Sequence, residues 1–235
     1  ARIIAMGLNC ETENKPTANP CGICSNCKAI LQDRYEDVLE IDAASNTGVD
    51  DVREIISSLK YRPSKGRYKV FIIDEVHMLS NSAFNALLKT IEEPPSFVKF
   101  IFCTTEIQKI PITIVSRCQK YNLNRVTLTA LCNYLEEIAE LEKLNVSKEA
   151  ITIIARNSEG SIRDSLTILD QCILSFNNEN IDVESVNQTI GLTSQGFILD
   201  MYIDIVNGDI VNANKALHNI YKNGAVPKQI IDDLL

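Results

Sequence analysis

The sequence predicts an α/β domain followed by helical domains, and two observations carry this prediction. Between residues 38 and 122, short β-rich runs alternate with helical patterns, which is typical of a parallel sheet covered by helices on both faces. After Arg125 the β-rich runs stop, and apolar residues recur at the i, i+3, i+4 spacing of helices. We therefore expect an α/β domain over residues 1–125, a small helical domain over 126–190 and the start of a third helical domain over 191–235, which ends in mid-pattern as a truncated domain would.

The α/β domain is expected to open with a helix over Ala1–Cys10 and to continue with four strands. The strand candidates, rich in β-branched and aromatic residues, are Val38–Asp42, Tyr68–Asp74, Lys99–Thr104 and Gln119–Leu123. Helical patterns lie between them at Val49–Lys60 and Asn81–Ile91, the second of which is stopped by Pro94 and Pro95.

Helices account for the rest of the chain. The helical domain offers Thr127–Leu144, Ser147–Asn157, Ile162–Phe176 and Val183–Ile190, and the third segment offers Gly196–Val206, Asp209–Lys222 and Pro227–Leu235.

Composition excludes two classes of protein. No apolar run approaches the roughly 18 residues of a membrane helix, so a membrane role is not expected. The net charge is −8, yet residues 1–125 carry 16 basic and 15 acidic side chains while residues 126–235 carry 7 and 16. A uniformly basic nucleic-acid coat is therefore excluded, and any contact with DNA must be local.

Four of the eight cysteines crowd into one short segment, at Cys10, Cys21, Cys24 and Cys27. The two-residue gaps allow neighbouring thiolates to converge on one tetrahedral ion, and four thiolates leave no open coordination position. The spacing therefore predicts a structural zinc site, against the alternatives of free buried thiols or two disulfides. The other cysteines stand singly, which suits a reducing cytoplasm.

An apolar strand that ends in two adjacent acids is the second strong signal. Asp74 and Glu75 follow Val70–Ile73, and the pattern looks like a Walker B element. At the carboxyl end of a parallel strand, Asp74 can hold the Mg²⁺ of a nucleotide and Glu75 can act as the base toward the attacking water. Adjacent acids also occur at plain strand exits.

The next strand ends in Thr104, Thr105 and Glu106. The ends of neighbouring parallel strands meet at one edge of a sheet, so a hydroxyl here can hydrogen-bond a γ-phosphate or the attacking water. A threonine chosen only for β propensity is the alternative, and it suits Thr104 better.

The candidate DNA-facing residues surround the start of the helix at Val49. Asn46 or Thr47 can cap that helix, and Arg53 in its second turn could reach a phosphate. A well-capped helix without DNA contact is the equal alternative. We interpret a basic run as a solvated loop, with DNA contact as the lesser option: Lys60, Arg62, Lys65, Arg67 and Lys69.

Seven motifs occur along the chain in a fixed order: LNC, PCGICSNC, EIDAASNTGVDDVR, VFIIDEVHMLS, FNALLKTIEEPP, SRC and GSIRDSL. Together they resemble the gamma/tau subunits of bacterial DNA polymerase III, which are clamp-loader AAA+ ATPases. The resemblance covers residues 1 to about 190 nearly continuously. It implies an AAA+ sheet domain with an inserted zinc module at residues 10–27, a helical lid, and a collar domain for oligomerisation.

The resemblance also implies a function, an ATP-driven motor that opens the sliding clamp and sets it on primed DNA within a five-membered assembly of clamp-loader subunits. A long tail, absent here, would bind the polymerase core. Asp74 and Glu75 match the family's Walker B pair, Thr105 its sensor 1, Arg117 its arginine finger acting on a neighbour's ATP, and Arg163 its sensor 2. The implied cofactors are ATP, Mg²⁺ and Zn²⁺, the last at the four cysteines, and the implied location is the cytoplasm.

One departure from the family pattern concerns the phosphate-binding loop. A P-loop is expected immediately before Ala1, and none occurs in the 235 residues. We expect that the segment with the P-loop is missing from the start of this sequence, and that the chain as it stands is inactive as an ATPase by itself. Two other functions compete: a non-hydrolysing stator of the clamp loader, and a zinc-dependent module that bridges replication proteins. For Arg117 and Arg163, a surface arginine paired with a nearby acid is the plain alternative.

Overall fold

The computed structural model describes residues 1–45, 47–176, 180–190 and 193–222. The chain divides into two compact units, Ala1–Tyr121 and Asn122–Leu235. Each unit is described by itself.

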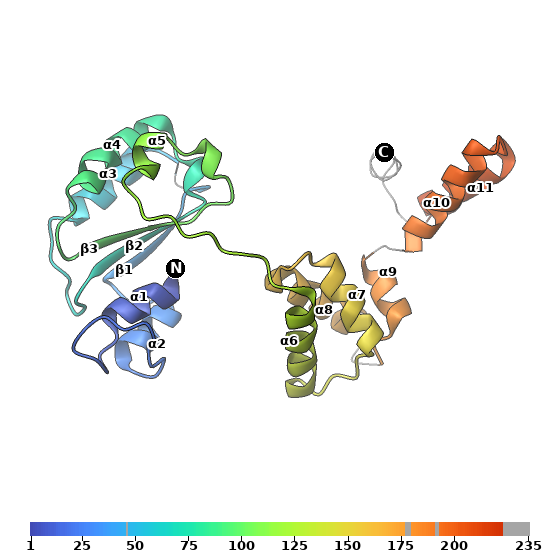
Figure 1. The fold of residues 1–235 in the computed structure, drawn as a ribbon, viewed down its shortest axis with the longest axis horizontal. Helices are drawn as coiled ribbons and strands as arrows, with labels where there is room; N and C mark the ends of the chain where they lie inside the picture. Colours follow the sequence, from blue (N-terminus) through green and yellow to red (C-terminus); the bar gives the residue numbers. More distant parts are fainter. Residues whose placement is uncertain (46, 177–179, 191–192, 223–235) are drawn as a thin grey trace. The chain divides into compact units, whose positions relative to one another are not determined.

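The first unit is built on a three-stranded parallel sheet in the order β1-β2-β3 (Figure 1). The strands are β1 (Val38–Asp42), β2 (Lys69–Asp74) and β3 (Val98–Phe102). Asp42 and Asp74 are paired across β1 and β2, so the carboxyl ends of these two strands lie side by side.

Helices cover both faces of this sheet. Figure 1 shows α1 (Arg2–Asn9) and α2 (Ser25–Leu31) on one face, and α3 (Val49–Ser58) and α4 (Asn81–Glu92) on the other. The short helix α5 (Ile112–Val115) lies on the α4 side. The α/β class expected from the sequence is therefore confirmed.

The position of the central strand, β2, explains why its sequence contains an unbroken run of apolar residues. Phe71 and Ile73 belong to the core under α3 and α4, whereas Val70 and Ile72 belong to the core under α1 and α2. All four side chains are at most 1% exposed. A strand that is covered on both faces has no polar side to show, so alternation is lost.

The predicted strand at Gln119–Leu123 is wrong, because these residues form no strand in the structure. Tyr121 is 77% exposed and Leu123 is 95% exposed. Their composition favours β structure, but a strand exists only when a neighbour accepts and donates its main-chain hydrogen bonds. The other three predicted strands match within two residues at each end.

Four of the described helices of the second unit surround one apolar core. They are α6 (Leu128–Leu141), α7 (Lys148–Asn157), α8 (Ile162–Phe176) and α9 (Val183–Ile190). Thr127 caps α6 and Ser147 caps α7, each accepting a hydrogen bond from the N–H three residues on. The core residues are Leu131, Leu135, Ala150, Ile151, Ile154, Ala155, Leu169, Cys172, Ile181 and Val186.

The remaining described helices, α10 (Thr193–Val206) and α11 (Ile210–Lys222), pack against each other as a hairpin (Figure 1). Met201 and Ala213 are buried in it. The predicted helix at Pro227–Leu235 lies outside the described residues. Among the helices that the structure does describe, none combines the length and apolar character needed to cross a membrane.

Candidate functional site

The acid pair lies at the carboxyl edge of the sheet, at the end of its central strand. Asp74 is the last residue of β2 and its side chain is exposed. Its main-chain carbonyl accepts the N–H of Ala43, which follows β1, at 3.0 Å. This position places one carboxylate where a loop-bound phosphate or its cation would lie in an open α/β sheet.

Glu75 adopts a left-handed backbone conformation, with φ of 46°. Its N–H donates to Oδ1 of Asp74 at 3.0 Å. A non-glycine residue in this conformation costs on the order of 1 kcal/mol, and such strain is concentrated at functional sites. The turn is fixed to the neighbouring strand because the N–H of Val76 donates to the carbonyl of Cys103 at 3.0 Å.

The two threonines after β3 have different surroundings. Thr104 Oγ1 lies 3.0 Å from Nδ1 of His77 and accepts the N–H of Glu106 at 3.0 Å. Thr105, the predicted sensor, is exposed. Thr104 is thus engaged within the protein, whereas Thr105 is exposed, and the sensor role of Thr105 stays a prediction.

His77 is a residue of this site that sequence reasoning missed. It belongs to the short 3-10 turn Val76–Met78 directly after the acid pair, and its side chain is only 7% exposed. Nδ1 lies 3.3 Å from Oε2 of Glu75, and Nε2 lies 3.3 Å from Oε1 of Glu106. Its place three residues after Asp74 was the one signal in the sequence, but the contacts depend on the next strand.

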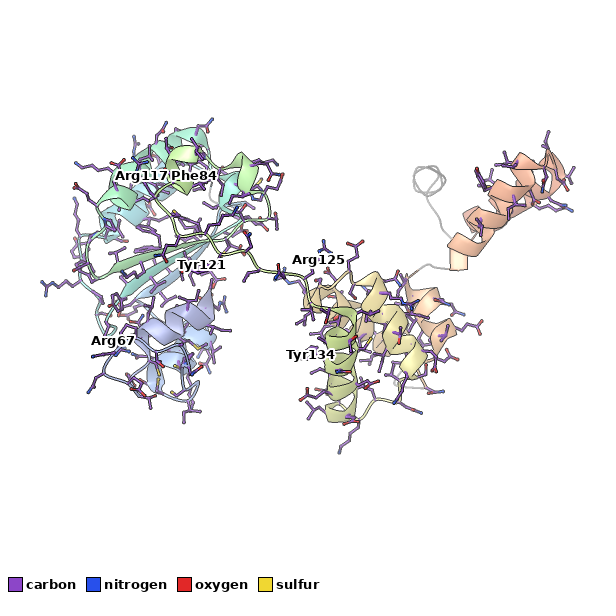
Figure 2. The ribbon with its side chains drawn as sticks, in the orientation of Figure 1. Arg67, Phe84, Arg117, Tyr121, Arg125 and Tyr134 are labelled. Atoms are coloured by element: carbon purple, nitrogen blue, oxygen red, sulfur yellow. The ribbon has the colours of Figure 1, made fainter. Side chains whose placement is uncertain are left out.

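Arg117 follows the short helix α5 and is held against the end of α4 (Figure 2). One guanidinium nitrogen lies 2.5 Å from Oε1 of Glu92, and the other donates to the carbonyl of Thr113 at 2.7 Å. The pairing with an acid left open by the sequence is therefore present. Both side chains are more than a third exposed, and such pairs contribute about 0–1 kcal/mol, so the pair does not preclude another role.

The other predicted nucleotide residue, Arg163, lies in the first turn of α8 in the second unit and is exposed. Glu159, a nearby acid four residues earlier in the chain, is paired with Arg125, whose Nη1 lies 2.9 Å from Oε2 of Glu159. The role of Arg163 in nucleotide binding stays a prediction.

The candidate DNA-facing residues that the structure describes make a main-chain hydrogen bond and an exposed ion pair within the protein. Asn46 lies outside the described residues. The carbonyl of Thr47 accepts the N–H of Ser80 at 3.3 Å. Arg53 is paired with Asp50 one turn earlier on α3, at 2.8 Å, with both side chains largely exposed. A role in DNA binding therefore stays a prediction for all three.

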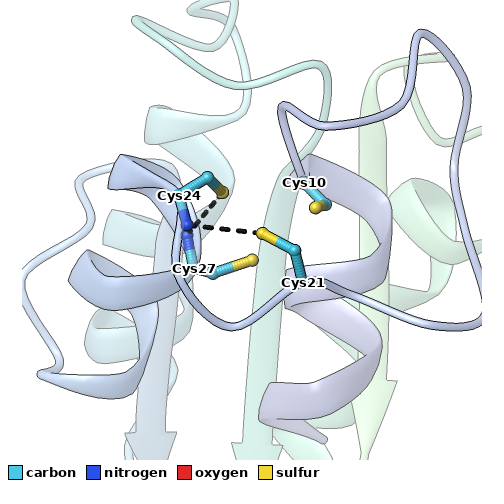
Figure 3. A group of neighbouring side chains, drawn as sticks. All are labelled: Cys10, Cys21, Cys24 and Cys27. Carbon is cyan, nitrogen blue, oxygen red and sulfur yellow. Dashed lines mark hydrogen bonds between the residues drawn. The ribbon is translucent and has the colours of Figure 1, made fainter.

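The four clustered cysteines converge on one point, as Figure 3 shows. The four sulfur atoms all lie within 4.8 Å of one another, and the thiols are free. Cys10 follows the end of α1, and Cys24 caps α2 by accepting the N–H of Cys27. Four sulfurs about 2.3 Å from a central zinc ion would lie within this spread, so the residues fit a closed tetrahedral site. Among the described residues, this is the group of side chains that could hold a metal ion.

The environments of the thiols differ. The Thr12 hydroxyl, and after it the N–H of Cys24, lowers the pKa of Cys21 to about 6. Burial, and after it the Cys24 thiol, raises the pKa of Cys27 to about 12. A bound cation favours the thiolate form of every ligand, so zinc would offset the cost of ionising Cys27.

Side chains from outside the cysteine segment fix it to the sheet, and sequence reasoning missed them. Arg67 donates to the carbonyls of Leu8, Cys10 and Glu13 at 3.1, 2.5 and 2.6 Å. Arg67 appears beside this segment in Figure 2. The interpretation of the basic run as solvated is thus wrong for Arg67, because the end of α1 and the loop after it expose carbonyl groups that need donors. It is also wrong for Lys69, which donates to the carbonyl of Ser58 at 2.9 Å.

Asn9 completes this attachment. Its side chain donates to the carbonyl of Tyr68 at 3.0 Å and accepts the N–H of the same residue at 2.9 Å. Asn26 donates to the carbonyl of Asn9 at 2.9 Å. The cysteine segment and the start of β2 therefore form one hydrogen-bonded body.

Comparisons with known proteins match this chain to subunits of DNA polymerase III. A family described as "DNA polymerase III, delta subunit" matches residues 1–127, and one described as "DNA polymerase III clamp loader subunit, ATPase lid domain" matches residues 130–184. The chain is 43% identical to DNA polymerase III subunit tau of Bacillus subtilis and 44% identical to that of Escherichia coli, over 100% and 91% of this chain. It spans 41% and 33% of the length of these relatives.

The fold has solved counterparts as well. The structure of the Thermotoga maritima RuvB Holliday junction branch migration motor matches with a TM-score of 0.55 and 18% identity, over 77% of this chain and 63% of that one. At this identity the likeness concerns the fold, and it agrees with an AAA+ architecture. The identities to tau subunits, together with the two family matches, agree with the resemblance found in the sequence. The chain therefore belongs to the clamp-loader subunits of DNA polymerase III, in the gamma/tau group.

Proposed function

We propose that this chain is the motor part of a clamp-loader subunit, which uses ATP to help open the sliding clamp and load it on primed DNA. The carrying observation is the acid pair at the carboxyl end of the central parallel strand, in a chain that belongs to the gamma/tau group. The proposed partners are the other clamp-loader subunits, the sliding clamp and primed DNA.

In this proposal, each polar residue at the edge of the sheet has one task. Asp74 offers an exposed carboxylate, the ligand type that Mg²⁺ prefers, and it would hold the ion there. The ion supplies charge neutralisation on the phosphate oxygens when bound. Glu75 takes the proton from the attacking water, and Thr105 hydrogen-bonds the γ-phosphate or that water.

Two arginines complete the proposal. Arg117 acts on the ATP of a neighbouring subunit and leaves Glu92 to do so, which costs little because that ion pair is exposed. Arg163 acts as sensor 2, on the strength of the resemblance of the residues around it to the family motif. The four cysteines hold a structural zinc ion that stabilises the segment after α1.

The test is ATP hydrolysis by the full-length subunit in its assembly, stimulated by primed DNA and clamp. Glu75→Gln keeps the shape of the side chain but removes the base, so turnover should fall by about 10²-fold or more while ATP binding is retained. The matched control is Glu137→Gln, an exposed glutamate on α6, which should leave turnover unchanged. Wild-type turnover by Glu75→Gln would remove Glu75 from the reaction. A wild-type assembly whose ATPase did not depend on this subunit would favour the stator instead.

A further inference from the structure

The turn that follows the acid pair contains a buried histidine between two carboxylates. His77 has 7% of its side chain exposed, although both of its ring nitrogens face polar atoms. Nδ1 lies 3.0 Å from Thr104 Oγ1 and 3.3 Å from Glu75 Oε2, and Nε2 lies 3.3 Å from Glu106 Oε1. Burial of an imidazole is expected only where its nitrogens find partners.

The Glu75 carboxylate has two different environments. Oε2 is buried and has no hydrogen-bond partner among the described residues, yet 40% of the side-chain surface remains exposed. The 3.3 Å contact with His77 Nδ1 meets the distance of an ion pair without the alignment of a hydrogen bond. Burying a carboxylate oxygen without a donor is costly, and Nδ1 of His77 is a group at 3.3 Å that can offset this cost in the tautomer or charge state in which it carries a proton.

The same imidazole touches the segment that follows β3 on both sides of Thr105. Thr104 contacts Nδ1 and Glu106 contacts Nε2, while Glu106 is held in place by Lys109 at 2.7 Å. Thr105 itself is exposed. The main chain adds a second tie, since the N–H of Val76 donates to the carbonyl of Cys103.

We propose that His77 is a positioning residue that fixes the Glu75 carboxylate and the Thr104–Glu106 segment relative to each other. The proposal rests on the proposed function, in which Glu75 is the base and Thr105 the sensor. In this role His77 has no contact of its own with the nucleotide or the attacking water. It acts through Glu75, and its removal leaves the carboxylate free to take orientations in which it no longer faces the water.

The test uses the full-length subunit in its assembly and separates kcat from KM. His77→Ala should lower kcat by about 10²-fold, the scale of a small misplacement of a reacting group, with ATP affinity nearly unchanged. Asparagine places its amide nitrogen near the position of Nδ1, whereas glutamine reaches toward that of Nε2. His77→Asn should therefore recover most of kcat, and His77→Gln should not. The matched control is His218→Ala, which replaces the other histidine, exposed on α11.

A double variant distinguishes positioning from general damage. Because His77 acts through Glu75, adding His77→Ala to Glu75→Gln should lower kcat no further. A comparable melting temperature for His77→Asn and His77→Gln, with different kcat values, would exclude a purely structural role. If His77→Ala does not fold, the comparison of His77→Asn with His77→Gln still decides whether His77 positions Glu75.

Two outcomes would overturn the proposal: a kcat for His77→Ala within about threefold of the wild type, or a His77→Asn variant no better than His77→Gln. The failure of the proposed function looks different. Glu75→Gln would then turn over ATP at the wild-type rate, whereas an inactive Glu75→Gln beside a fully active His77→Ala refutes the positioning role alone.

Discussion

Replacing Asp37 by asparagine tests how the loop before β2 is held, and with it the cysteine segment. Asp37 is 3% exposed and accepts three main-chain N–H groups. Oδ1 accepts from Ser64 at 2.7 Å, and Oδ2 accepts from Lys65 at 2.8 Å and Gly66 at 2.7 Å. The next residue, Arg67, is the donor to the carbonyls around Cys10. One buried carboxylate thus orients the loop that supports the proposed zinc site.

The expected loss of stability in Asp37→Asn follows from these three hydrogen bonds. Asparagine keeps one oxygen, so it can serve Lys65 and Gly66 while its amide hydrogens face the N–H of Ser64. A hydrogen bond to a charged acceptor contributes about 1.5–3 kcal/mol and a neutral one about 0.5–1.5 kcal/mol. Losing one charge-assisted bond and weakening two others gives a destabilisation of about 3 kcal/mol. For a unit of this size, the melting temperature should fall by about 10 °C.

The assay is calorimetric unfolding at pH 7, with Glu36→Gln as the matched control. Glu36 is the exposed neighbour, and its carboxylate accepts a side-chain hydrogen bond, from Ser64 Oγ at 3.0 Å. Its replacement should change stability by less than about 0.5 kcal/mol. Amide exchange at residues 64–66 should accelerate in Asp37→Asn alone. If Asp37→Asn melts within about 2 °C of Glu36→Gln, the three bonds do not carry the stability assigned to them.

The pH dependence has a definite sign. Burial raises the pKa of Asp37, but the N–H groups of Gly66, Lys65 and Ser64 together outweigh burial, and the pKa is lowered. A carboxyl group with a depressed folded pKa stabilises the protein above its unfolded pKa of about 3.9, and this stabilisation is lost as the pH falls through the folded pKa. The difference between wild type and Asp37→Asn should be full at pH 7 and should shrink below about pH 4.

Three further predictions concern the metal, the trans arginine and the second unit. Reduced, zinc-replete protein should hold one zinc ion per chain. Cys24→Ser should lose both the zinc and thermal stability, whereas Cys132→Ser, outside the cluster, should keep the zinc; metal analysis that finds no zinc in the wild type would contradict this. Mixed assemblies of Arg117→Ala and Glu75→Gln subunits should regain ATPase only where an intact Arg117 meets an intact nucleotide site, because arginines supplied by a neighbour contribute on the order of 10³ to 10⁵ in rate. Arg117→Ala subunits that stay inactive beside intact arginines would refute the assignment of Arg117 as a residue that acts on the neighbouring subunit's ATP. Gly160→Ala should lower the melting temperature more than Gly208→Ala. Both glycines have positive φ, but a Cβ at Gly160 would lie 2.7 Å from the carbonyl oxygen of Val126, whereas nothing lies within 4 Å of a Cβ at Gly208. Equal falls in melting temperature would show that the contact with Val126 is irrelevant.

Within the candidate site, local patterns predicted which residues end the strands but not how those residues contact one another. Asp74 ends β2, Glu75 follows it directly and Thr105 lies three residues after the end of β3, because apolar runs and polar exits are properties of a few neighbouring residues. The contact of His77 with Glu106 joins residues on two different strand exits, and no short sequence window contains both. The same is true of Arg117 and Glu92, which meet because α5 packs on the α4 side.

The sequence by itself determined the parallel α/β class, the bounds of α8 and α9, and the family to which the chain belongs. Helical periodicity, caps and cysteine spacing are local, and they act before the chain is compact. Tertiary structure alone decided that Gln119–Leu123 is not a strand, since no strand among the described residues pairs with it. It also decided that Arg67 faces the cysteine segment rather than solvent, because the carbonyl groups at the end of α1 lie within its reach only after β2 and α1 have packed together.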